Sequence, residues 1–127
     1  MKTLWMTGSV LLLAACASAP KPVSSSEAWA TYRDEVTRER DRGLLTAVQA
    51  EEKIQAKYRE LYGPDPTMEG AFAYGRDLYA MAQAGKLPES EADAFANARI
   101  DEIFARRAAR DEYHAWMEKR FPPEPSD

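Results

Sequence analysis

The stretch GPDP at residues 63–66 decides the predicted fold, because it separates two segments that share one helical pattern. Two prolines in three residues cannot continue a helix, since proline lacks a backbone N–H and its ring clashes with the preceding turn. Apolar residues recur at helical spacing on both sides of Gly43, before this stretch, and on both sides of Gly85, after it. Each half therefore predicts a helix, a glycine turn and a second helix.

The half before GPDP predicts one helix from residue 27 to Gly43 and a second from Thr46. Ser24 with Glu27, and Thr46 with Gln49, have capping-box spacing. The first apolar face contains Trp29, Tyr32 and Val36. The second contains Ala47, Ala50, Ile54, Tyr58 and Leu61. The charged side of the second helix is expected to be exposed and carries Glu51, Glu52, Lys53, Lys57, Arg59 and Glu60.

The half after GPDP predicts a third helix capped by Thr67 and a fourth helix over residues 88–120. Pro88 suits the first turn of the fourth helix. The third apolar face contains Met68, Phe72, Gly75, Leu78, Tyr79 and Ala82. The fourth contains Ala92, Ala96, Ile100 and Ile103, with Phe95 and Phe104 beside it. The fourth helix is the longest of the four.

The two halves also align with each other without a gap at an offset of 42 residues. Residues 27–62 and 69–104 then share seven identical positions in 36 pairs, including the glycines at the turns. Either the chain contains a duplication, or the same helix-turn chemistry selects the same residues twice. Both interpretations predict an all-α protein, a small four-helix bundle made of two antiparallel helical hairpins with a long fourth helix.

The start of the chain has the pattern of a secretory signal. Lys2 is followed by a mostly apolar run that ends in Leu13-Ala14-Ala15-Cys16, and this run is too short to span a bilayer. The four residues resemble the lipobox of bacterial lipoproteins. The resemblance implies cleavage between Ala15 and Cys16 and lipidation of Cys16, whose acyl chains would hold the protein on a membrane. An uncleaved anchor, or an ordinary signal with a coincidental cysteine, is the alternative.

This resemblance sets the expected domain organisation. Residues 1–15 form the signal peptide, 16–26 the lipidated cysteine and a flexible Pro/Ser-rich linker, 27–121 the helical domain, and 122–127 a disordered tail. Ala17 follows the cysteine in place of the aspartate that commonly retains such proteins at the inner membrane. The resemblance therefore implies the outer membrane, facing the periplasm.

Composition excludes some functions. After removal of residues 1–15 the chain has 16 Lys and Arg against 21 Asp and Glu, a net charge of 16 − 21 = −5. Such an acidic protein is a poor nucleic-acid binder, since that binding depends on neutralising phosphates. Cys16 is the only cysteine, so no intramolecular disulfide forms and the domain must be held by packing.

The sequence contains no convincing catalytic or metal site. His114, the only histidine, lies four residues before Glu118, a spacing that brings two ligands to one helix face. A zinc site needs at least one more protein ligand, and nothing in the sequence points to one. We expect His114 to be a surface residue, and we expect no catalytic residue, metal, cofactor or small-molecule ligand.

The end of the fourth helix carries the best candidate for a binding surface. The apolar residues there extend beyond the length that the other helices can cover: Tyr113, Trp116, Met117 and Phe121. They either fold back over the end of the bundle or form an exposed strip for a partner. A basic group precedes them: Arg99, Arg106, Arg107 and Arg110. Acidic neighbours at helical spacing are expected to neutralise most of it.

These features favour a non-enzymatic protein-binding or assembly module of the bacterial envelope. Helical-bundle lipoproteins called pilotins hold a partner's terminal helix in a groove, and the chain resembles them in size, anchor and helicity only. A periplasmic hydrolase or hydrolase inhibitor that uses carboxylates or His114 is one alternative. A structural envelope lipoprotein is another.

Overall fold

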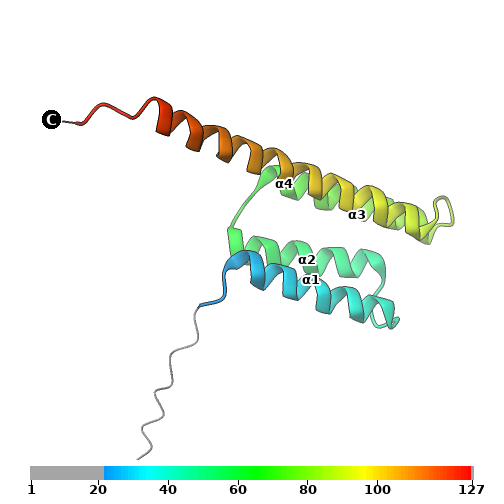
Figure 1. The fold of residues 1–127 in the computed structure, drawn as a ribbon. Helices are drawn as coiled ribbons and strands as arrows, with labels where there is room; N and C mark the ends of the chain where they lie inside the picture. Colours follow the sequence, from blue (N-terminus) through cyan, green and yellow to red (C-terminus); the bar gives the residue numbers. More distant parts are fainter. Residues whose placement is uncertain (1–21, 127) are drawn as a thin grey trace, which may run out of the picture.

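The computed structural model describes residues 22–126, in which four α-helices account for all regular structure. The helices are α1 (Ser25–Asp41), α2 (Ala47–Tyr62), α3 (Pro66–Gln83) and α4 (Glu89–Arg120). They form two antiparallel hairpins, α1–α2 and α3–α4, joined at residues 63–65 (Figure 1). The predicted all-α fold with a long fourth helix is confirmed. The predicted signal peptide, with Ala15, and Cys16 and most of the predicted linker lie outside the described residues.

The two hairpins turn in the same way. Gly43 and Gly85 have φ angles of 77° and 73°, a conformation that glycine adopts without a side-chain clash. The amide of the following residue then bonds back to a carbonyl five residues earlier, Leu44 to Glu39 at 2.9 Å and Lys86 to Met81 at 3.0 Å. This is the Schellman pattern, which satisfies the last carbonyls of a helix. The shared turn follows from shared glycine chemistry, with or without a duplication.

The helix starts follow the predicted caps in the first half and differ from them in the second. Ser24 caps α1, and Thr46 with Gln49 forms a complete capping box on α2. The prediction that Thr67 caps α3 is wrong: Asp65 does so, accepting from the amide of Met68. The reason is that proline fits the first helical position, where no N–H is needed. Pro66 therefore starts α3 two residues earlier than we predicted.

The start of α4 also differs from the prediction by one residue. Pro88 lies at the N-cap, in an extended conformation, and not within the first turn. Its carbonyl accepts the amide of Ala92 at 3.1 Å, so the helix begins at Glu89. The acidic residues Glu89 and Glu91 then occupy the first turn, where the helix dipole favours negative charge.

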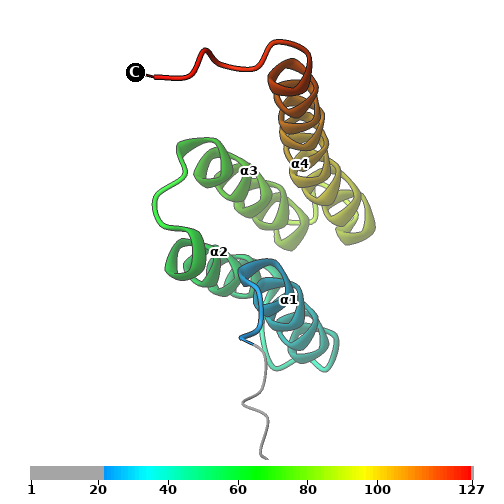
Figure 2. The same cartoon turned by 60° about the vertical axis from the view of Figure 1, so that its left-hand side comes forward.

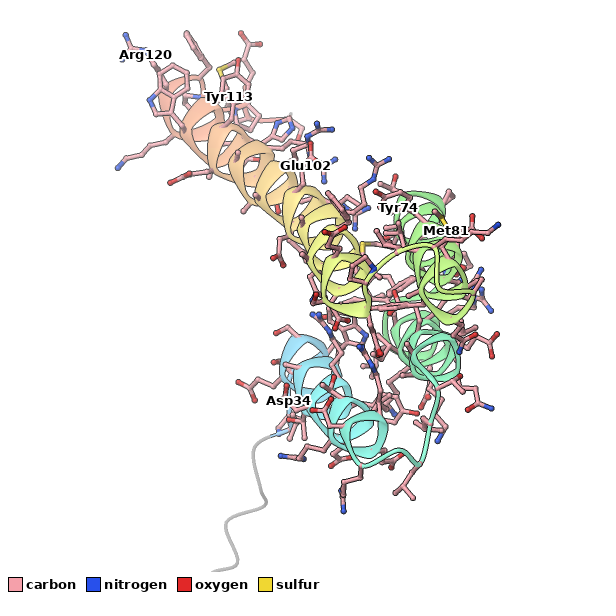
Figure 3. All side chains as sticks on the ribbon, turned by 90° about the vertical axis from the view of Figure 1, so that its right-hand side faces the viewer. Asp34, Tyr74, Met81, Glu102, Tyr113 and Arg120 are labelled. Atoms are coloured by element: carbon pink, nitrogen blue, oxygen red, sulfur yellow. The ribbon has the colours of Figure 1, made fainter. Side chains whose placement is uncertain are left out.

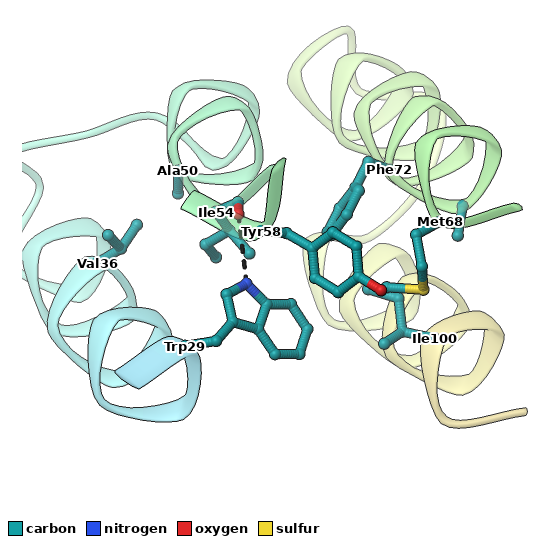
Figure 4. Packing of buried hydrophobic residues seen from close by; sticks show 9 residues of the cluster. Trp29, Val36, Ala50, Ile54, Tyr58, Met68, Phe72 and Ile100 are labelled. Atoms are coloured by element: carbon teal, nitrogen blue, oxygen red, sulfur yellow. Dashed lines mark hydrogen bonds between the residues drawn. The ribbon is translucent and has the colours of Figure 1, made fainter. Parts of the chain in front are cut away.

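The core lies where the predicted apolar faces meet. Trp29 of α1 packs edge-on against Tyr58 of α2 at 5.3 Å between ring centroids and against Phe72 of α3 at 6.4 Å (Figure 4). Its indole N–H donates to the carbonyl of Ile54 at 3.3 Å, so the ring is buried without losing a hydrogen bond. Ile100 brings α4 into the same cluster.

Each helix packs on the next one along the chain, α1 on α2, α2 on α3 and α3 on α4 (Figure 2). The first and last helices meet only through long side chains. Near the glycine turns, Arg40 of α1 reaches Glu89 and Asp93 of α4. At the opposite end, Trp29 packs against Phe104 at 5.7 Å between ring centroids. The bundle therefore has a seam between α1 and α4 that side chains bridge at both ends.

Candidate functional site

The final part of α4 extends beyond the bundle. Phe104 is level with Trp29, near the start of α1, and Arg107 contacts Asp65 in the connection between the hairpins. The 13 residues from 108 to 120 follow these last contacts and still form regular helix. At 1.5 Å per residue they project by about 20 Å. We call residues 108–120 the overhang; Figure 3 shows it standing clear of the other helices.

The overhang and the residue after it carry the four predicted contact residues on one side, which we call the aromatic strip: Tyr113, Trp116, Met117 and Phe121. Tyr113 is 57% exposed, Trp116 52% and Phe121 62%. Tyr113 and Trp116 stack on each other at 6.1 Å between ring centroids, and Arg120 lies over the Trp116 ring at 5.8 Å. Of the two alternatives from the sequence, folding back over the bundle is therefore wrong. Such exposed aromatic residues on a projecting helix are typical of a docking surface.

The histidine and the acid considered as metal ligands lie on the same overhang. His114 and Glu118 are exposed, and the His114 ring lies 6.0 Å from the ring of Tyr113. Within residues 22–126, no group of three His, Cys, Asp or Glu side chains lies close enough to hold a metal ion. The pair therefore has no third protein ligand among the residues that the structure describes.

The arginines of the basic group on α4 contact different side chains. Arg107 donates to the Asp65 carboxylate from both terminal guanidinium nitrogens, at 2.7 and 2.9 Å. Arg106 pairs with Glu102, and Arg99 lies over the Tyr74 ring at 5.6 Å. The expectation that acidic neighbours at helical spacing neutralise most of this group holds for Arg106, whereas Arg107 binds a carboxylate in the connection between the hairpins and Arg99 lies on an uncharged ring.

Asp65 is the group that fixes the base of the overhang. Besides Arg107, its carboxylate accepts from the Tyr58 hydroxyl at 2.7 Å and from the α3 amide that it caps. The hydrogen bonds from Arg107, followed by those from Tyr58 and the amide, lower the pKa of Asp65 well below its usual range, although burial opposes this. One carboxylate thus joins α2, α3 and α4.

A second polar cluster joins α1 to α4 at the end of the bundle near the glycine turns. Arg40 binds both oxygens of Asp93 at 2.8 Å each, and also Glu89 at 2.8 Å. Asp93 also accepts from the Tyr79 hydroxyl at 2.6 Å. Burial works against the ionised carboxylate, but the hydrogen bonds from Arg40 and Tyr79 outweigh it and lower the pKa of Asp93. Burial, with the bond to Asp93, raises the pKa of Tyr79.

Beside this cluster lies a cavity of about 200 Å³ between α1 and α4, with Glu51 of α2 in its lining. We predicted that Glu51 is exposed, and this is wrong, because only 6% of the residue is accessible. Its Oε1 lacks a hydrogen-bond partner among the described residues. The oxygen lies against Gly75 of α3, where a Cβ would come within 2.8 Å of it. Burial raises the pKa of Glu51 to about 7, although Arg33 and Arg76 favour the charged form.

A signal for this burial was present in the sequence. Glu51 lies four residues after Ala47 and three before Ile54, so helical spacing places it on the apolar face. Gly75 lies on the predicted apolar face of α3, where it leaves room for a longer side chain opposite. A charged residue at core spacing, facing a glycine, therefore indicates a buried carboxyl.

Comparison with protein-family models, curated proteins and solved structures finds no match. None of the described helices combines the length and apolar character that crossing a membrane requires.

The buried carboxyl predicts a specific dependence of stability on pH. Glu51 has a folded-state pKa of about 7 against 4.5 for a free glutamate, so the folded state holds its proton more tightly. The free energy of unfolding should therefore fall between pH 4.5 and pH 7, by on the order of 3 kcal/mol. Glu51→Gln should remove this fall. Urea denaturation at pH 5 and pH 8 measures the free energy of unfolding of the parent protein and of the Glu51→Gln variant.

Glu52→Gln is the matched control, because residue 52 is the exposed neighbour on the same helix. The carboxylates with lowered pKa, among them Asp65, Asp93 and Glu69, titrate below this pH window. A Glu51→Gln protein that keeps the full pH dependence of the parent would show that Glu51 is not the group responsible.

Proposed function

We propose that this protein is a lipid-anchored module of the bacterial envelope that binds another protein through the aromatic strip on α4. It has no enzymatic role in this proposal. The observation that carries it is the overhang: a 13-residue extension of a stable helix that presents two half-exposed aromatic rings where nothing in the bundle needs them. Keeping such side chains in water is unfavourable unless a contact uses them.

The position of the overhang fits a membrane-anchored protein. In Figure 1 the start of α1 and the overhang lie at the same end of the bundle, and the pairing of Trp29 with Phe104 agrees. Under the lipobox interpretation, the eight peptide links from Cys16 to Ser24 span at most about 28 Å. The anchor would therefore hold the aromatic strip near the membrane surface, within reach of other anchored or embedded proteins. The proposed site is the periplasmic face of the outer membrane.

The hydrolase alternative now has Glu51 as its best residue. A carboxyl with a pKa of about 7 beside a cavity is a feature of general acids. The cavity is small, however, and two of the other charged groups in its lining, Arg40 and Asp93, are bound to each other. His114 lies on the overhang and is remote from this cavity. These observations favour a structural role for Glu51. A purely structural lipoprotein would have no use for the strip.

The anchor is tested by Cys16→Ser. In cells fed labelled palmitate, the parent protein should incorporate label and fractionate with the outer membrane. The variant should incorporate none and lose its membrane association, because the sulfur that carries the diacylglycerol is gone. Labelling that survives in Cys16→Ser would contradict the lipobox interpretation.

The strip is tested by photo-crosslinking in intact cells. Replacing Trp116 with benzoylphenylalanine should give a protein adduct after irradiation, because the probe lies in the contact surface. The same probe at Ala115, on the other side of the overhang, is the matched control and should give at least fivefold less adduct. Equal yields from both positions, or none from either, would count against a protein-binding strip.

A further inference from the structure

We infer that the occupant of the aromatic strip is a second copy of this chain, bound antiparallel through the overhang. This inference rests on the proposed function, since it names the partner of the same strip. Helical spacing places Ala109, Tyr113, Trp116 and Arg120 along one line on the overhang, at i, i+4, i+7 and i+11. Two such lines can face each other about a twofold axis, with each copy using the same residues.

The register follows from the sizes of the side chains on this line. With the axis between residues 114 and 115, Tyr113 of each copy lies opposite Trp116 of the other. The two stacked aromatic pairs then form one cluster. Arg120, whose guanidinium lies over the Trp116 ring, falls opposite Ala109, whose small side chain leaves it room. The axis also lies within half a residue of the midpoint of residues 108–120, so almost the whole overhang is used.

The charges beside this line are complementary in the same register. Glu112 and Lys119 lie seven residues apart on one flank, and neither forms an ion pair with any residue from 22 to 126. In an antiparallel pair of helices each flank faces the same flank of the other copy. Glu112 therefore approaches Lys119 of the second copy, and the symmetry creates this pair twice. In a parallel arrangement these residues would not meet.

The contact area explains why a membrane anchor matters for this assembly. Full burial of an aromatic side chain removes about 150–250 Å² from water, so the half-exposed Tyr113 and Trp116 together offer roughly 200 Å² per copy. A stable interface buries about 800 Å² per partner. Copies diffusing freely would associate weakly, whereas lipid anchors raise their effective concentration on one surface.

The position of the linker is compatible with this arrangement. The start of α1 lies at the overhang end of the bundle, so in the antiparallel pair both linkers leave near the twofold axis (Figure 1). With this axis normal to the membrane, both anchors reach the same bilayer. The pair therefore needs no rearrangement of the bundle to form on a membrane.

Charge reversal tests the inference on the full lipidated chain in native membranes. The readout is the yield of the adduct from benzoylphenylalanine at position 116 that has the mass of two copies. Glu112→Lys alone and Lys119→Glu alone should each lower this yield roughly tenfold, because each places like charges opposite each other twice. The double exchange Glu112→Lys/Lys119→Glu should restore it, since both charges change in both copies. Asp111→Lys, on the opposite side of the helix, is the control and should leave the yield unchanged.

Restoration by the double exchange is specific to a second copy, because a different partner would not change its own charges. A double variant that is as defective as the single variants would overturn the inference. An adduct with another protein would also overturn it while leaving the proposed function standing. An adduct with phospholipid, or no adduct at all, would overturn both.

Discussion

The carboxylate of Asp65 is the interaction on which the rest of the structure depends. It sits between two prolines in the connection between the hairpins, caps α3, accepts from Tyr58 of α2 and binds Arg107 of α4. At this end of the bundle it gives the first hairpin, the start of the second hairpin and the long helix a directional contact, which apolar packing does not provide. Asp65 thereby sets the point on α4 at which the bundle ends and the overhang begins.

The two ends of the α1–α4 seam are stabilised by different kinds of interaction. Near the glycine turns, Arg40 forms a bidentate pair with Asp93, and the geometry of the guanidinium fixes the relative position of α1 and α4. Near the overhang, Trp29 and Phe104 make an edge-to-face aromatic contact. Between them, Glu51 is buried, and one of its oxygens has no hydrogen-bond partner within residues 22–126. The core thus tolerates one unfavourable group because polar and aromatic contacts close the seam around it.

Much of the fold could be predicted from the sequence because its signals are local. Helical spacing identified the apolar faces, and glycine chemistry identified both turns. The cap of α3 was missed because Thr67 and Asp65 are both good capping residues, and Pro66 at the first helical position decides between them. Spacing along α2 places Glu51 on the apolar face, but its burial also depends on the space that Gly75 leaves on another helix, and no pattern along α2 encodes that space.

The sequence indicated which residues form the candidate site, but it did not indicate whether they are exposed. The four residues of the aromatic strip followed from composition and spacing. Whether they would fold back depended on where α4 loses contact with α1 and α3, and the pairings at Phe104 and Arg107 decide this. These are contacts between residues far apart in the sequence. Cys16 lies outside the described residues, and the proposal that it carries a lipid anchor rests on the resemblance to the lipobox.

The central claim, that the aromatic strip is a contact surface covered in the native membrane, is tested most directly by hydroxyl-radical footprinting with mass spectrometry. In dilute purified protein, Tyr113 and Trp116 should be oxidised readily, as their exposure implies. In native membranes both should be protected several-fold. Tyr74, which is 41% exposed on the bundle, should react equally in both samples. Equal oxidation of Trp116 in the two samples would contradict the claim.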